Sequence, residues 1–98
     1  MRIVIVGAGN VGRSIARELT AHGHQILLID KNPRAMKPDT APEAEWLCAD
    51  ACELATLEEA RLDNCDISIS ATGDDKVNLV HSLLAKTEFG VSRTVARV

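Results

Sequence analysis

A glycine-rich segment near the start of the 98-residue chain has a spacing that suits pyrophosphate binding. Gly7, Gly9 and Gly12 form the pattern Gly-x-Gly-x-x-Gly directly after an apolar run. The first glycine permits a tight turn, the second lets a phosphate approach the backbone, and the third lets a helix pack closely on a sheet. The free N–H groups and the positive end of the helix that starts near Asn10 then face the phosphates. The spacing therefore predicts an anion-binding turn.

A carboxylate supplies the second chemical group. Asp30 closes a second apolar run, eighteen residues after Gly12. At the end of a strand, this carboxylate can accept hydrogen bonds from the hydroxyls of an adenosine ribose, and its charge repels a 2′-phosphate. NAD is therefore favoured over NADP, although Lys31 and Arg34 weaken that inference. Strand, glycine turn, helix, strand and acid together indicate a dinucleotide-binding unit, and a glycine turn without a ligand is the alternative.

Alternating apolar runs and helical periodicity provide the elements that position these groups. The sequence predicts strands over 2–6, 25–29, 46–49, 66–71 and 93–98, and helices over 10–22, 53–61 and 76–88. Between residues 31 and 45, three prolines predict a short helix or turn and a loop. The pattern predicts a doubly wound, Rossmann-like α/β fold of about five parallel strands in the order 3-2-1-4-5, without the usual sixth strand. We expect residues 1–98 to form one domain of a longer protein.

Composition restricts the function further. A net charge of −3 argues against nucleic-acid binding through a basic surface. The sequence shows no signal peptide and no apolar stretch of transmembrane length, so we expect membrane association only through a partner. Three cysteines without a metal-binding spacing indicate reduced thiols, with Cys48 in the core, and no metal site. We also expect no catalytic residue, because His81 has no acidic partner in sequence and tyrosine is absent.

Taken together, these motifs resemble the N-terminal nucleotide-binding domain of Trk-type potassium-uptake regulators, also called the RCK or KTN domain. The resemblance covers nearly the whole chain and rests on residues 5–12, 29–30, 49–51, 71–79 and 95–98. The segment 71–79, which contains Asp-x-x-Asn, is more specific than the glycine pattern because ordinary dehydrogenases lack it.

The resemblance implies a regulatory role without catalysis. In this family, cytosolic domains form dimers and rings beneath a membrane pore, and bound NAD(H), or ADP and ATP in relatives, changes the shape of the ring. The chain would thus be part of a longer regulator, cytoplasmic and peripheral at the inner face of the membrane. Its partners would be a membrane potassium transporter subunit and further copies of itself, in a dimer or ring.

The resemblance also places the residues of the site. NAD or NADH is the expected cofactor, with ATP or ADP as alternatives; many ATP-responding members carry Arg where this chain has the neutral Asn10. The expected cofactor-binding residues are Gly7, Gly9, Asn10, Val11 and Gly12 in the turn, Asp30 and Lys31 at the ribose, Asp50 and Ala51 near the adenine, Thr72 and Gly73 beside the nucleotide, and Arg97 toward the site or a dimer contact.

Several of these residues have simpler explanations. Asp50 is equally consistent with a cap on the next helix. Asp74 and Asp75 are interpreted as helix-start residues and not as an acid–base pair. Asn78 is assigned a structural or site role over a solvent-facing one, and Arg97 is equally consistent with a charge that protects an edge strand.

Two alternative functions stay open. One is the cofactor domain of an NAD-dependent oxidoreductase, although the chain lacks a convincing catalytic pair. The other is an assembly module whose nucleotide site is weak or lost, which Asn10 and the sequence Ala-Asp-Ala-Cys at 49–52 keep open.

Overall fold

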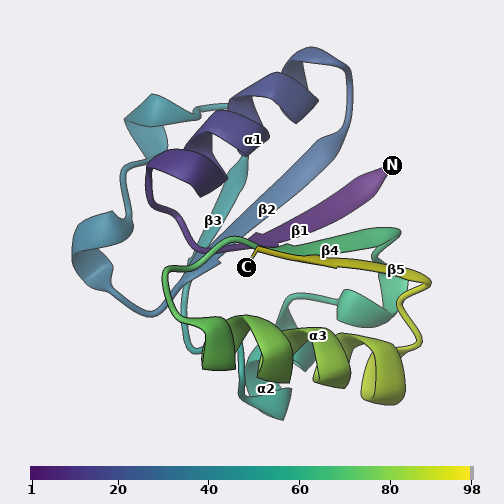
Figure 1. Ribbon diagram of the computed structural model, residues 1–98. Helices are drawn as coiled ribbons and strands as arrows, with labels where there is room; N and C mark the ends of the chain where they lie inside the picture. The colour runs from purple at the N-terminus through teal and green to yellow at the C-terminus, as the bar shows by residue number, and fades with distance from the viewer. Residues whose placement is uncertain (98) are drawn as a thin grey trace.

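Five parallel strands form one sheet between two layers of helices in the computed structural model, which describes residues 1–97 (Figure 1). The strands are β1 (Arg2–Val6), β2 (Gln25–Asp30), β3 (Glu45–Cys48), β4 (Ile67–Ser70) and β5 (Arg93–Ala96). One face of the sheet is covered by α1 (Asn10–Ala21), and the other by α2 (Leu54–Glu59) and α3 (Asp75–Phe89). The order β3-β2-β1-β4-β5 confirms the predicted Rossmann-like fold.

Strand β1 is the centre of the core. Its four apolar residues after Arg2 are each 2% exposed or less, because helices cover both faces of a parallel sheet. Side chains alternate along the strand, so Ile3 and Ile5 pack on the α1 side while Val4 and Val6 pack on the α2 and α3 side. The continuous apolar run thus joins two separate core layers.

The register aligns the carboxyl ends of β1, β2, β3 and β4. Val6, the last residue of β1, pairs with Ile29 on one side and Ser70 on the other. Asp30 pairs with Cys48 at the ends of β2 and β3. As a result, the segments that follow these strands all leave the sheet at the same edge.

The segment between β2 and β3 contains two short 3-10 turns, η1 (Pro33–Ala35) and η2 (Pro38–Thr40), in place of a long helix. This outcome confirms the expectation from the prolines. The prediction that Cys48 is a core residue is wrong, because its side chain is exposed. Cys48 is the last residue of an edge strand, where its thiol lies 3.8 Å from the Lys31 carbonyl oxygen, and the buried cysteine is Cys65.

The last elements differ little from the prediction. Helix α3 spans 15 residues, against 76–88 predicted. Strand β5 ends at Ala96 instead of 98, and Val98 lies outside the described residues. Within residues 1–97, no helix has both the length and the apolar character needed to cross a bilayer.

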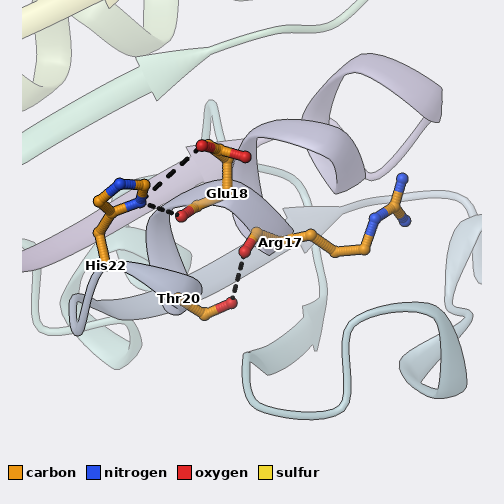
Figure 2. Close-up of polar contacts among 4 residues, drawn as sticks. All are labelled: Arg17, Glu18, Thr20 and His22. Carbon is orange, nitrogen blue, oxygen red and sulfur yellow. Dashed lines mark hydrogen bonds and ion pairs between the residues drawn. The ribbon is translucent and has the colours of Figure 1, made fainter.

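Side chains at the carboxyl end of α1 make polar contacts with carbonyl oxygens of its last turns (Figure 2). The Nδ1 atom of His22 lies 2.8 Å from the Glu18 carbonyl oxygen, and the Thr20 hydroxyl donates to the Arg17 carbonyl oxygen at 3.1 Å. Gly23 follows with φ +86°, a conformation that favours glycine. These contacts belong to the helix end near the start of β2, away from the turn that follows β1.

A substitution at Gly12 tests how closely α1 packs on the turn that follows β1. A Cβ at Gly12 would lie 1.8 Å from the Gly7 carbonyl oxygen. Helix propensity alone would make Gly12→Ala stabilising by about 1 kcal/mol. We expect the steric conflict to dominate and to lower the free energy of unfolding, measured in urea, by at least about 2 kcal/mol.

Gly9→Ala is the matched control, because nothing lies within 4 Å of a Cβ added at Gly9. Its unfolding free energy should change by no more than about 1 kcal/mol. A Gly12→Ala protein as stable as the unaltered protein would contradict the packing described here.

Candidate functional site

A cleft of about 310 Å³ lies at the carboxyl ends of β1, β2, β3 and β4. In open parallel sheets, this is the edge where ligands bind, at the point where the strand order reverses. The first β-α turn and the loops after the other three strands form its walls. The lining residues are Val6, Gly7, Ile29, Asp30, Lys31, Ala49, Asp50, Ala51, Thr72, Gly73, Asp74 and Val77.

The glycine turn forms one side of the site. Gly7 has φ +105°, and a Cβ there would lie 2.9 Å from the Ala71 carbonyl carbon, so only glycine fits without strain. Helix α1 begins directly afterwards with Gly9 as its N-cap, and no side chain caps it. The first N–H groups of the helix are therefore left for another acceptor, and the open space above Gly9 admits one.

Asp30 joins the turn to the end of β2. Its Oδ2 accepts a hydrogen bond from the Ala8 N–H at 3.0 Å, and its Oδ1 accepts one from the Asn32 N–H at 2.9 Å. Each carboxylate oxygen can accept two hydrogen bonds, so both retain a position for a ribose hydroxyl. The sequence predicted that this carboxylate contacts a ligand, but not that it accepts hydrogen bonds from the main chain.

The loop after β3 is shaped by Asp50. Its Oδ1 accepts from the Cys52 N–H at 2.9 Å, which closes a local turn. The N-cap of α2 is Glu53, whose side chain makes no capping bond. The interpretation of Asp50 as the cap of α2 is therefore wrong, whereas its place in the cleft wall is compatible with the predicted ligand contact.

The N-cap of α3 and one residue in its first turn hold the wall of the cleft that follows β4. Asp74 caps the helix by accepting from the N–H groups of Lys76 and Val77, which confirms its interpretation as a helix-start residue. Asn78 is 1% exposed, so the solvent-facing interpretation is wrong. Its Oδ1 accepts from the Thr72 N–H at 3.1 Å, and its Nδ2 donates to the carbonyl oxygens of Thr72 and Arg97, both at 3.1 Å.

The structure brings seven of the twelve predicted residues into the cleft, namely Gly7, Asp30, Lys31, Asp50, Ala51, Thr72 and Gly73. Gly9, Asn10, Val11 and Gly12 occupy the turn and the first helical turn beside it. Arg97 lies apart: its N–H donates to the Ser70 carbonyl oxygen at 2.8 Å, and its exposed side chain borders a hollow between β5 and α3. The cleft of this single chain thus contains no contact from Arg97.

Sequence reasoning did not identify the remaining lining residues. Val6 and Ile29 are the apolar residues at the ends of β1 and β2, Ala49 follows β3, Asp74 is the N-cap of α3, and Val77 lies in its first turn. For the first three, the position at or next to a strand end is the signal that could have found them, whereas Asp74 and Val77 required the position of α3. Within residues 1–97, no three His, Cys, Asp or Glu side chains are arranged to hold a metal ion.

The charge of the cleft is unbalanced. Its lining contains the carboxylates of Asp30, Asp50 and Asp74 but only one cation, Lys31. The Asn10 side chain, at the start of α1, accepts from Arg13 and carries no charge. This arrangement can bind a ligand with hydroxyl and amino donors, while phosphate charges are best placed at the N-terminus of α1.

Comparison with known proteins places the chain in a family. The TrkA-N domain model matches residues 3–98. The chain belongs to the TrkA-N domain family. The Trk system potassium uptake protein TrkA of Mycobacterium tuberculosis is 55% identical over 98 residues, which cover the whole chain and 44% of that protein. A TrkA homolog of Methanothermobacter thermautotrophicus is 36% identical over 100 residues, covering the whole chain and 45% of its own length.

This TrkA-N chain therefore spans less than half the length of these curated relatives. Among solved structures, the AMP-bound C-terminal domain of Shewanella denitrificans Kef superposes with a TM-score of 0.85 at 22% identity, over 100% of this chain and 59% of that one. The NAD(P)-binding domain of an exopolyphosphatase-related protein from Archaeoglobus fulgidus gives 0.80 at 24% identity, over 98% and 71%. At such identities these likenesses show the fold, and the family model confirms the resemblance drawn from the sequence.

His81 on α3 is fully buried, and its burial predicts that the stability of the TrkA-N domain depends on pH. Burial lowers the pKa of the imidazole below its ordinary value of 6.5, and the hydrogen bond to Ala51 opposes this only in part. The unfolded chain therefore binds more protons than the folded one below pH 6.5. We expect the stability from this residue to be fully present above pH 6.5 and to decline as the pH falls below it.

Urea unfolding at a series of pH values checks this expectation. His81→Asn removes the titrating group, so its stability should fall less between about pH 7 and pH 5 than that of the unaltered protein. A protein that becomes more stable on acidification in this range, or identical slopes for the two proteins, would contradict the assignment.

Proposed function

We propose that this TrkA-N domain is the NAD(H)-binding regulatory domain of a Trk-type potassium-uptake system. One observation carries the proposal: the uncapped N-terminus of α1 and the open space above Gly9 lie beside the carboxylate of Asp30. A pyrophosphate fits the open space at the N-terminus of α1, and the hydroxyls of an adenosine ribose can bond the carboxylate of Asp30. Family membership supports the role in potassium uptake, since the mycobacterial relative is named for it.

The charges favour NAD or NADH over ATP as the ligand. Three carboxylates line the cleft against one ammonium group, so a ligand with fewer phosphate charges meets less repulsion. Asp30 also disfavours a 2′-phosphate, which argues against NADP. The solved Kef domain that shares the fold is described in an AMP-bound form, which supports an adenine nucleotide more generally.

Regulation requires that the ligand bind one conformation more tightly than another. Asn78 offers a physical connection for this, because its amide group bonds both Thr72 in the cleft wall and the Arg97 main chain beyond β5. A shift of the Thr72–Gly73 segment on binding would therefore reach the end of β5. In our proposal, copies of the domain assemble in a dimer or ring at the inner face of the membrane and transmit this shift to a potassium transporter subunit.

Binding of NADH, NAD, NADPH and ATP, measured side by side by calorimetry, tests the proposal. The unaltered protein should prefer NADH or NAD. Gly9→Val should weaken their binding by at least about tenfold while the protein stays folded, because its side chain enters the space assigned to the pyrophosphate. Asp30→Asn keeps an oxygen for the Ala8 N–H and should reduce the preference for NADH over NADPH.

Thr20→Val provides a matched control at the other end of α1 and should leave the affinities unchanged. In the assembled transporter, NADH should alter potassium flux, and the Gly9→Val protein should not respond. Absence of nucleotide binding by the folded, unaltered protein would contradict the proposal and favour an assembly module. Tighter binding of ATP would keep a regulator but change its signal to the energy charge of the cell.

A further inference from the structure

His81 connects the cleft to the core through two hydrogen bonds. Its Nδ1 lies 2.9 Å from the Ala51 carbonyl oxygen, and its Nε2 lies 2.6 Å from the Ser68 Oγ. Both His81 and Ser68 are at most 1% exposed, and Ser68 belongs to β4 in the sheet. The residue thus joins α3, a central strand and the loop after β3.

The chemistry of the partners fixes the proton positions. A carbonyl oxygen can only accept, so Nδ1 carries the proton and donates it to Ala51. In the neutral imidazole, Nε2 is then an acceptor, and the Ser68 hydroxyl donates to it. The side chain therefore has a donor for the loop and an acceptor for the sheet, with neither ring nitrogen unpaired.

The bond to Ala51 holds a wall of the cleft. Asp50 and Ala51 line one side, and Asp74 and Val77, from the beginning of α3, line another. The other bond between this loop and α3 joins the Cys52 thiol to the Val77 carbonyl oxygen at 3.7 Å, and thiols are weak donors. The His81 bond is therefore the stronger of these two polar links between the walls, beside the packing of Ala51 in the apolar core.

We infer that His81 is a positioning residue for the adenosine end of the site, holding the Asp50–Ala51 wall through its Nδ1–H bond to Ala51 at the spacing that the nucleotide requires. The inference rests on the proposed nucleotide-binding function. Nothing in the sequence pattern of α3 signals this role, because the two partners lie in other elements.

Paired substitutions separate positioning from general packing. In His81→Asn, the amide nitrogen is as many bonds from Cα as Nδ1, so it can still donate to Ala51. In His81→Gln, the amide reaches the place of Nε2 and leaves the Ala51 oxygen without its donor. We expect the Asn variant to bind NADH within about threefold of the unaltered protein and the Gln variant to bind at least about tenfold more weakly.

The double variant His81→Leu with Ser68→Ala replaces both polar partners with apolar groups, a change that proteins tolerate well. It should stay folded by circular dichroism and bind NADH as weakly as the Gln variant. Ser68→Ala alone keeps the Ala51 bond and should bind within about threefold of the unaltered protein. Equal affinities for all variants, or equal losses in the Asn and Gln variants, would overturn the inference.

Amide hydrogen exchange of residues 50–53, measured without nucleotide, gives a second readout on the same proteins. Exchange should be faster in the Gln and double variants than in the Asn variant, and equal rates would overturn the inference even if no nucleotide binds. Failure of the unaltered protein to bind NADH would count against the proposed function alone. If a variant does not fold, NMR of the unaltered protein decides, since an imidazole of His81 that carries its proton on Nε2 and none on Nδ1 contradicts the bond to Ala51.

Discussion

The close contact between the first turn of α1 and the turn after β1 is the constraint on which the site depends. No side chain fits at Gly12, because a Cβ would meet the Gly7 carbonyl oxygen at 1.8 Å. This contact lets the helix start immediately beside the sheet and directs its free N–H groups to the carboxyl ends of the strands. Gly9 adds no side chain there, so the space stays open. The same few glycines therefore allow both the close packing of α1 and the approach of a ligand.

Polar side chains around the cleft form hydrogen bonds chiefly with the main chain. The carboxylate of Asp30 holds the glycine turn, the amide of Asn78 holds the loop after β4, and the imidazole of His81 holds the loop after β3. Each is half-buried or buried, where an unpaired polar group is costly. These bonds join the loops around the cleft to the sheet and to α3.

Much of the fold could be predicted from the sequence because its signals are local. The apolar run before Gly7, the glycine spacing and Asp30 lie within one β-α-β unit, and the structure pairs these strands as expected. The prolines between residues 31 and 45 also indicated short turns correctly. Local patterns of this kind need no knowledge of what packs against them.

The rest depended on contacts between distant elements. His81 bonds residues 13 and 30 positions away, so no spacing in the sequence reveals its role. For Asn78 a structural or site role was predicted, but its bond to the main chain of Arg97 was not. The exposure of Cys48 follows from its place at the end of an edge strand, which the apolar pattern of β3 does not show. The lining of the cleft by Asp74 likewise required the position of α3.

The central claim is that a dinucleotide binds across the glycine turn and the loops after β2, β3 and β4. NMR titration of the protein with NADH tests it most directly, because each backbone amide reports its own surroundings. We expect the largest shifts at the amides of residues 9–12, with further shifts at 30–31, 50–51 and 72–73, and little change at residues 20–24. Shifts confined to other surfaces, or none at saturating NADH, would contradict it.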